Sequence, residues 1–258
     1  PHVEQYYNAA PLRILFGHSF GGVFVFNVLL SDPMAFNALI AASPSLWYDK
    51  EILIKKGQGF FKKNRSLDRF LFYSIGGEES ARMKNPANTM FDILKSNAPT
   101  NFKWHYRLIE NETHGTVPHL SLYFALQTFF SDWRYPRLAD RTKETLVRLR
   151  NHYLKLSEKY KYEVRPAEGE VNRLGYQFLR AKKYKDAFET FSFNIKLYPN
   201  SPNVYDSLGE LHETKGELKL AKINYKKAVH YAQMQGTGDL NYLMGNLNRV
   251  EKAMKKKK

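Results

Sequence analysis

Ser19 is the residue in this chain that is best placed for nucleophilic chemistry. It is the serine of a Gly-x-Ser-x-Gly pentapeptide at residues 17–21. A short apolar run over residues 12–16 precedes the pentapeptide, and residues 23–30 can continue it as a helix. Strand, sharp turn and helix in this order are the sequence form of a nucleophile elbow, which exposes the serine hydroxyl at the tip of the turn.

The residues around Ser19 have predicted structural roles. We expect Gly17 and Gly21 to be required because a sharp turn brings backbone segments too close for a Cβ atom. The helix that follows leaves its first backbone N–H groups without intrahelical partners. The N–H of Phe20 is therefore the predicted oxyanion donor. His18 is expected to support the turn rather than to act as a base.

A serine hydroxyl needs a general base, and the imidazole of that base needs a carboxylate that fixes its tautomer and orientation. His114 follows an apolar run and is the predicted base, and Glu79 or its neighbour Glu78 is the predicted acid. The order Ser19, Glu79, His114 is the Ser, acid, His order of the nucleophile-elbow fold. His105 lies within an expected strand and is predicted to be packed or solvent-facing, and His119 is predicted to cap the helix that follows. The alternatives for the acid are Glu110 and Glu112. A Ser–His pair that works without an acid is a further alternative.

The elements that must position these residues are strands alternating with helices. Strands are expected over residues 12–16, 37–42, 70–75 and 102–108, and helices over residues 88–95 and 120–130. This alternation predicts an α/β fold with a parallel sheet covered on both faces. Ligands of such sheets bind beyond the carboxyl ends of the strands. Ser19, Glu79 and His114 each follow a different expected strand, so we expect them to converge on one crevice.

Composition excludes several other classes of protein. The chain has 258 residues, of which 43% are hydrophobic, so it can form one or two globular domains. It has no cysteine, which excludes disulfides, thiolate metal sites and a cysteine nucleophile but leaves bacterial cytoplasm and periplasm both open. No run is long and apolar enough for a membrane span, and the first residues do not form a targeting segment. No His, Asp and Glu cluster has metal-ligand spacing, so we predict neither a metal nor a cofactor.

The positive charge lies mainly in the second half of the chain. Residues 1–136 contain 14 Lys and Arg against 11 Asp and Glu, whereas residues 137–258 contain 26 against 14. The basic residues are scattered along expected helices rather than interleaved with aromatic residues on one surface. This pattern is typical of a solvated helical surface, and we do not expect nucleic acid to be a partner.

The second half is predicted to be helical and repetitive. A pattern with spacings of three and four within residues 137–166 predicts a connecting amphipathic helix. The pattern consists of Thr142 and the larger side chains of Leu146, Leu149, Tyr153, Leu156 and Tyr160. In residues 167–258, Leu174-Gly175, Ala187 and Phe191 recur 34 positions later as Leu208-Gly209, Ala221 and Tyr225. A further helix over residues 239–254 resembles a cap.

Taken together, the motifs of the first half resemble one branch of the α/β hydrolases. The segments that carry the resemblance are residues 17–22, 43–47 and 112–115, within a region of about residues 10–133. The branch includes enterochelin and salmochelin esterases of the IroE type, esterase D and feruloyl esterases. The resemblance implies that a small-molecule carboxylic ester is hydrolysed, with Ser19 as nucleophile and His114 as base. By analogy Ser45 and Trp47 lie near the pocket, although a capping turn and a core tryptophan are the alternative.

The chain departs from this family ahead of the elbow. Family members have several strands and the first oxyanion donor there, and residues 1–11 have no comparable pattern. Residues 12–16 are almost uniformly apolar, as in a strand that is buried on both faces. We therefore expect residues 1–136 to be the C-terminal part of a hydrolase domain, or to associate with something that covers this strand.

The period of 34 residues resembles that of tetratricopeptide repeats. The resemblance implies a module that binds a peptide or protein partner, or that self-associates, through a groove; its expected lining is Asn172, Tyr176, Arg180, Asp206, Glu210 and Glu213. The prediction for the whole chain is a serine esterase with a helical appendage. An interaction or scaffold protein with an inactive hydrolase half is the alternative, and acyl transfer to an alcohol other than water would use the same residues.

Overall fold

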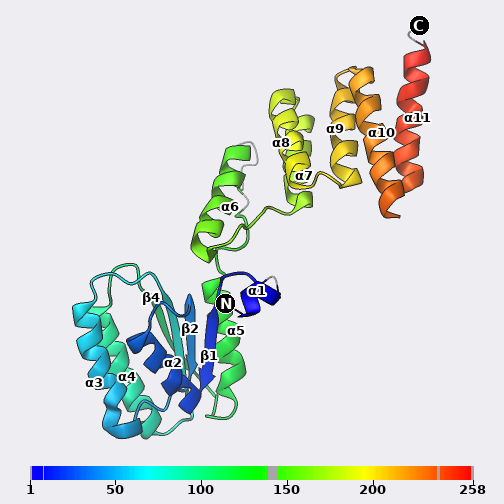
Figure 1. Cartoon of the computed structure of the whole chain (residues 1–258). Helices are drawn as coiled ribbons and strands as arrows, with labels where there is room; N and C mark the ends of the chain where they lie inside the picture. Colours follow the sequence, from blue (N-terminus) through cyan, green and yellow to red (C-terminus); the bar gives the residue numbers. More distant parts are fainter. Residues whose placement is uncertain (1, 8, 137, 139–144, 237–238, 257–258) are drawn as a thin grey trace. The chain divides into compact units, whose positions relative to one another are not determined.

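The computed structural model describes the chain except for residues 1, 8, 137, 139–144, 237–238 and 257–258. Thr142, predicted to begin the connecting helix, lies outside the described residues. The chain forms two compact units (Figure 1). The sheet unit comprises Pro1–Arg134 and Glu158–Tyr162, and the helical unit comprises Tyr135–Ser157 and Glu163–Lys258.

The sheet unit contains a parallel sheet, as the sequence predicts. Its strands lie in the order in which they occur in the chain: β1 (Ile14–His18), β2 (Ala38–Ala42), β3 (Phe70–Gly76) and β4 (Lys103–Ile109). All neighbouring pairs are parallel. The carboxyl ends of the four strands therefore lie at one edge of the sheet.

The position of β1 differs from the expectation of burial on both faces. β2 and β3 are buried along their whole length, whereas β1 is only half-buried. Within the described residues β1 pairs with β2 alone, and the side chain of Phe16 is 39% exposed. The apolar character of residues 12–16 is thus not matched by burial among the described residues.

Four helices cover the two faces of the sheet: α2 (Phe20–Ser31), α3 (Tyr48–Lys63), α4 (Ala81–Asn97) and α5 (Val117–Phe129). A short helix, α1 (His2–Tyr6), precedes β1. Helices α2, α3 and α4 pack on one face, where the largest core includes Phe26, Leu39 and Leu71. Strand side chains that alternate with these point to the other face of the sheet and pack against α5, as the contact of the Phe70 and Phe129 rings shows. Figure 1 shows α5 on the other side of the sheet from α3 and α4.

Two helices differ from the sequence prediction. The predicted helix over residues 88–95 is part of the longer α4, which contains Pro86 in its interior. Helix α3 is absent from the prediction, and its two glycines, Gly57 and Gly59, weaken the helical pattern. After its first residue, Tyr48, come three residues that have positive φ angles: Asp49, Lys50 and Glu51. Such a run is locally unfavourable for residues other than glycine, so no local pattern indicates it.

The helical unit contains pairs of adjacent helices. The helices that follow α5 in the chain are α6 (Leu146–Tyr160), α7 (Glu168–Arg180), α8 (Tyr184–Leu197), α9 (Pro202–Thr214), α10 (Leu218–Gln235) and α11 (Leu240–Lys256). The last residues of α6 belong to the sheet unit. Helix α7 packs on α8, and α9 packs on α10.

Equivalent contacts recur in the two helix pairs. A Cβ atom on Gly175 would lie 2.4 Å from the ring of Phe191, and one on Gly209 would lie 2.7 Å from the ring of Tyr225. Both distances are too short for a real side chain, so each pair needs glycine where the helices approach one another. The repeat found in the sequence therefore corresponds to a repeated packing contact.

The acidic residues expected to line a groove in this unit are bonded internally. Asp206 is 5% exposed, and burial raises the pKa of its carboxyl group. Its Oδ1 accepts a hydrogen bond of 2.9 Å from Asn246. Glu210 accepts one from Tyr176, and Glu213 pairs with Arg249. The expectation that Asp206 lines an open groove is therefore wrong, because this side chain is buried between helices.

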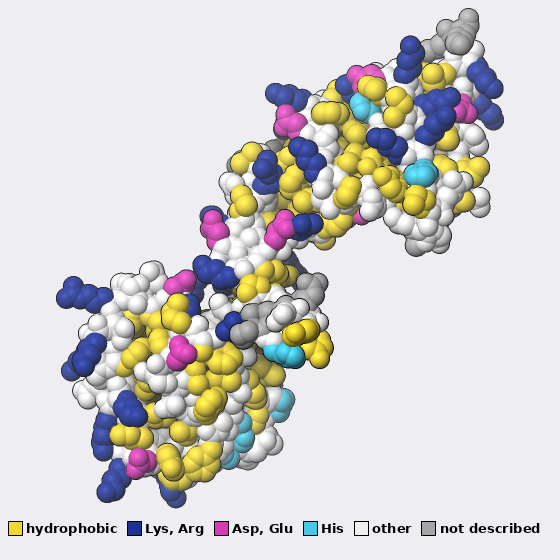
Figure 2. All heavy atoms as spheres, in the orientation of Figure 1, with side chains coloured by type: hydrophobic (Ala, Val, Ile, Leu, Met, Phe, Trp, Pro, Cys, Tyr) yellow, Lys and Arg dark blue, Asp and Glu magenta, His cyan; other side chains and the backbone are white. Residues whose placement is uncertain are grey.

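The surface of the helical unit matches the scattered charge in its sequence. In Figure 2 its Lys and Arg side chains are spread over the visible face with apolar side chains between them. Among the described residues, no helix combines the length and the apolar character that crossing a membrane would require.

Candidate active site

The turn between β1 and α2 holds Ser19 in a strained conformation. Ser19 has φ 58° and ψ −114°, values that a residue with a side chain rarely adopts. Its N–H donates a hydrogen bond of 3.0 Å to the carbonyl of Ala42 at the end of β2. The turn is thereby fixed to the neighbouring strand, and the hydroxyl lies beyond the carboxyl end of β1.

One of the two glycines predicted to be required in this turn has that role, and the other does not. A Cβ atom on Gly17 would lie 2.2 Å from the carbonyl oxygen of Gly21, as the prediction for Gly17 requires. The same prediction is wrong for Gly21, because a Cβ atom there would meet nothing within 4 Å. Gly22 is the second position without room, since its Cβ would lie 2.8 Å from Pro44. The second close approach is thus between α2 and the segment after β2.

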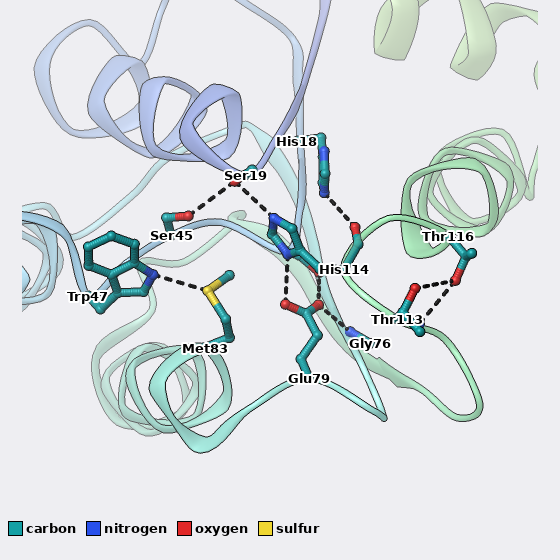
Figure 3. A network of polar contacts seen from close by, with 11 residues as sticks. His18, Ser19, Ser45, Trp47, Gly76, Glu79, Met83, Thr113, His114 and Thr116 are labelled. Atoms are coloured by element: carbon teal, nitrogen blue, oxygen red, sulfur yellow. Dashed lines mark hydrogen bonds and ion pairs between the residues drawn. The ribbon is translucent and has the colours of Figure 1, made fainter.

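Ser19, His114 and Glu79 form a hydrogen-bonded chain at the carboxyl edge of the sheet (Figure 3). The Nε2 atom of His114 lies 3.0 Å from the hydroxyl oxygen of Ser19. Its Nδ1 atom lies 2.8 Å from Oε2 of Glu79. The side chain of Glu79 is 2% exposed, whereas that of His114 is 42% exposed. An imidazole in this position can accept a proton from the serine while the carboxylate fixes its tautomer.

Two groups hold the buried carboxylate of Glu79. The hydroxyl of Ser43 and the N–H of Gly76 both donate hydrogen bonds to its Oε1, the latter at 3.0 Å. Its Oε2 therefore remains available to His114. Ser43 is fully buried and has a positive φ of 40°. Ser43 was not predicted as part of the site, although it directly follows a buried strand and begins one of the segments that carry the family resemblance.

The loops that carry the acid and the base are bonded to each other. The N–H of Gly77 donates to the carbonyl of Ile109 at 2.8 Å, and that of Glu78 donates to the carbonyl of Glu112 at 3.0 Å. A Cβ atom on Gly76 would lie 2.3 Å from the carbonyl oxygen of Glu112. Glycine at position 76 thus permits the close approach of the two loops.

His18 contacts the backbone of the candidate base, His114, rather than its ring nitrogens. Its Nε2 lies 2.8 Å from the backbone carbonyl oxygen of His114, so this nitrogen must carry the proton and donate it. The centroids of the two imidazole rings are 4.6 Å apart. Burial, and then the nearby His114, lower the pKa of His18 below 6.5. His18 therefore holds the backbone of His114 as a neutral donor.

Replacing His18 tests this anchoring role. We expect His18→Phe, which removes the donor, to lower any Ser19-dependent kcat/KM by about tenfold, and His18→Gln, which retains an N–H, to lower it less. The pH dependence of stability follows from the lowered pKa. The unfolded chain binds a proton on His18 more readily, so the stability that neutral His18 contributes is complete above about pH 6.5 and is lost as the pH falls.

Melting temperatures at about pH 7.5 and pH 5.5 check the second part of this prediction. Acidification should lower the melting temperature of the parent protein by more than that of the Gln variant, which lacks the ionisation. Equal decreases, or equal activities of the Phe and Gln variants, would show that His18 does not anchor the base.

An open groove of about 380 Å³ lies beside Ser19. Its lining includes Phe20, Ser45, Trp47, Glu78 and Met83. The hydroxyl of Ser45 lies 3.3 Å from that of Ser19, and the indole N–H of Trp47 donates to the sulfur of Met83 at 3.1 Å. The structure therefore brings both Ser45 and Trp47 to the groove, as the family resemblance implies.

Among the described residues, none of the other acids and histidines considered from the sequence forms a hydrogen bond with the imidazole of His114. Glu78 is exposed and lines the groove, whereas Glu79 makes the hydrogen bond. His105 lies within β4 with its ring against Phe70, and His119 lies in the first turn of α5. Among the residues that the structure describes, no group of three or more His, Asp or Glu side chains has an arrangement that could hold a metal ion.

Comparisons with known proteins relate this chain to esterases by sequence. No known family profile matches it. It is 35% identical over 100 residues to the ferri-bacillibactin esterase BesA of Bacillus subtilis, an alignment that covers 36% of this chain and 35% of that protein. It is 24% identical over 148 residues to the siderophore triacetylfusarinine C esterase of Aspergillus fumigatus, covering 47% and 50%. The chain therefore spans between a third and a half of the length of these curated relatives.

Comparisons with solved structures establish the fold. An IroE-like serine hydrolase from Shewanella oneidensis matches with a TM-score of 0.61 and 22% identity, covering 76% of this chain and 63% of that one. An uncharacterised protein from Capnocytophaga ochracea matches with a TM-score of 0.68 and 14% identity, covering 97% and 71%. The chain thus has the α/β fold of IroE-like hydrolases, and its sequence relatives are carboxylic ester hydrolases that act on siderophores.

Proposed function

We propose that this protein hydrolyses a carboxylic ester with Ser19 as nucleophile, His114 as general base and acid, and Glu79 as the carboxylate that orients the imidazole. The observation that carries the proposal is the hydrogen-bonded chain of 3.0 Å and 2.8 Å that joins these three side chains. The strained φ of Ser19 supports it, because such strain concentrates at functional sites. The names of the sequence relatives support the reaction class.

In the proposed reaction, the hydroxyl of Ser19 attacks the ester carbonyl carbon while Nε2 of His114 accepts its proton. The N–H of Phe20, at the start of α2, is one donor to the resulting oxyanion. His114 then gives the proton to the departing alcohol, which leaves an acyl group on Ser19. A water molecule, deprotonated by the same imidazole, releases the acid and restores the hydroxyl.

The substrate class that the relatives favour is a siderophore ester, since two of them are named for ferri-bacillibactin and triacetylfusarinine C. The groove beside Ser19 is open and is bordered by the aromatic side chains of Phe20 and Trp47. This lining suits an ester with a flat group next to the reacting carbonyl. Feruloyl and simple acyl esters fit the same chemistry and are the comparison substrates.

A serine-reactive fluorophosphonate tests the proposal on the full-length protein. We expect it to form one covalent adduct, on the peptide that contains Ser19, and to stop para-nitrophenyl butyrate hydrolysis in proportion to labelling. Hydrolysis that continues after complete labelling, or an adduct on another serine, would contradict the proposed nucleophile.

For the helical unit, we propose a repeat module of the tetratricopeptide type that serves as a scaffold. The supporting observation is the equivalence of the Gly175–Phe191 and Gly209–Tyr225 contacts, 34 positions apart. The hydrogen bond of 2.7 Å from Tyr176 to Glu210 joins successive repeats at the same spacing. Asp206, Glu210 and Glu213 all have partners within the helical unit, so we favour a scaffold role over capture of a basic peptide.

A further inference from the structure

Arg82 forms a cation–π interaction with Trp47, which lines the groove of the candidate active site. Arg82 is the second residue of α4, and its guanidinium carbon lies 3.7 Å from the centroid of the Trp47 ring. The indole is further fixed by its N–H, which donates to Met83, and by the edge of the Phe20 ring with centroids 5.9 Å apart. Arg82 therefore rests on an aromatic side chain that borders the groove of Ser19.

The contact of Arg82 with Trp47 is not supplemented by an ion pair among the described residues. Within these parts of the chain no carboxylate pairs with the guanidinium, and the side chain is exposed. Its position in the first turn of α4 is also locally unfavourable for a cation, because the positive end of the helix dipole lies there. The stacking on Trp47 thus holds a solvent-facing cation beside the groove of Ser19.

The stacking defines what Arg82 can bind. When a guanidinium lies on an aromatic ring, its N–H groups point outward from the edge of the pair and are free to donate. Two parallel N–H groups match the two oxygens of a carboxylate, which is the strongest hydrogen-bonded arrangement that arginine makes. Arg82 is not itself part of the groove lining, but Trp47, on which it lies, lines the groove together with Ser19 and Phe20.

We propose that Arg82, held on Trp47, binds a free carboxylate of the substrate, so that esters carrying a carboxylate are preferred over neutral esters of the same shape. This inference rests on the proposed ester hydrolysis and specifies its substrate class. Glu78 also lines the groove and is exposed. Its negative charge disfavours a carboxylate next to it, which directs the substrate anion toward Arg82.

The kinetic test compares two esters that differ only in charge. Para-nitrophenyl terephthalate carries one free carboxylate, and para-nitrophenyl terephthalamate has a neutral amide in its place. We expect the ratio of kcat/KM for the anionic ester to that for the neutral ester to fall about tenfold in Arg82→Gln and in Arg82→Met, which retains contact with Trp47. Arg82→Lys should lose less, because lysine keeps the charge but not the paired donors.

Two further variants complete the comparison. Glu78→Gln should raise the same ratio, since it removes the repelling carboxylate. Arg65→Gln is the matched control, because Arg65 is exposed on the same unit and does not line the groove. A ratio in Arg82→Gln equal to that in Arg65→Gln would overturn the inference, while Ser19-dependent hydrolysis of the neutral ester would leave the proposed function standing.

A binding measurement decides the inference independently of catalysis. In Ser19→Ala protein, monomethyl terephthalate should bind about tenfold more tightly than methyl terephthalamate, as measured by calorimetry, and the difference should vanish with the further change Arg82→Gln. Equal affinities of the two compounds, or no binding of either, would refute the carboxylate subsite. If the two compounds bind with this preference but the parent protein hydrolyses neither ester, the result would support the subsite and count against the proposed reaction.

Discussion

Replacing Ser19 with alanine is expected to lower kcat for ester hydrolysis by roughly 10⁴- to 10⁶-fold, because no other group in the proposed mechanism forms the acyl intermediate. The measurement is para-nitrophenyl butyrate hydrolysis by the full-length protein and its variant under identical conditions. Alanine has the same difficulty as serine in adopting φ 58°, so the turn should keep its conformation and the protein its melting temperature.

An activity within tenfold of the parent protein would contradict the role of Ser19. The helical unit would then be the better guide to function, since the hydrolase half would be a structural part of an interaction protein. Failure of the variant to fold is a separate outcome that the melting temperature reveals. In that case Ser19→Cys, which retains a nucleophile of similar size, should be labelled by a thiol reagent at this position.

Replacing Glu79 with glutamine is expected to lower kcat by about 10³- to 10⁴-fold. A glutamine amide can present an N–H to Nδ1 of His114 and so favour the tautomer that has its proton on Nε2, which cannot accept a proton from Ser19. The change also removes the negative charge that stabilises the imidazolium. The side chain is 2% exposed and similar in shape, so packing is retained. Steady-state kinetics with the same ester measure the effect.

Glu78→Gln is the comparison for this prediction, because Glu78 is adjacent in sequence but exposed, and it is Glu79 that bonds to His114. The loss in the Glu79 variant should exceed that in the Glu78 variant by at least a hundredfold. Similar losses in both variants, or a loss below tenfold for Glu79→Gln, would favour a Ser–His pair that works without an acid.

Much of the sheet unit is predictable from the sequence because its signals are local. Buried strands such as Ala38–Ala42 appear as short apolar runs, and the parallel arrangement follows from their alternation with helices. That arrangement brings the residues after each strand to one edge. The sequence therefore leads to Ser19, Glu79 and His114 together, and the structure places their side chains within hydrogen-bond distance.

The remaining features depend on contacts between distant segments and have no local pattern. The hydroxyl of Ser43 binds Glu79 only because two neighbouring strands end side by side. Gly22 is required by Pro44, and Gly76 by the carbonyl of Glu112, each pair being far apart in the chain. The left-handed residues near the start of α3 oppose local preference, so the sequence carries no signal for them.

The bonded loops after β3 and β4 make the members of the site depend on one another. Because Gly76 lets the acid loop lie directly on the base loop, a larger residue at position 76 would displace Glu79 and His114 together. Both residues are also tied back to the strand ends that carry the nucleophile, Glu79 through Ser43 and His114 through His18. A defect in any one of these loops is therefore expected to reach all three members of the site, so tolerance to substitution should be low well beyond the three side chains themselves.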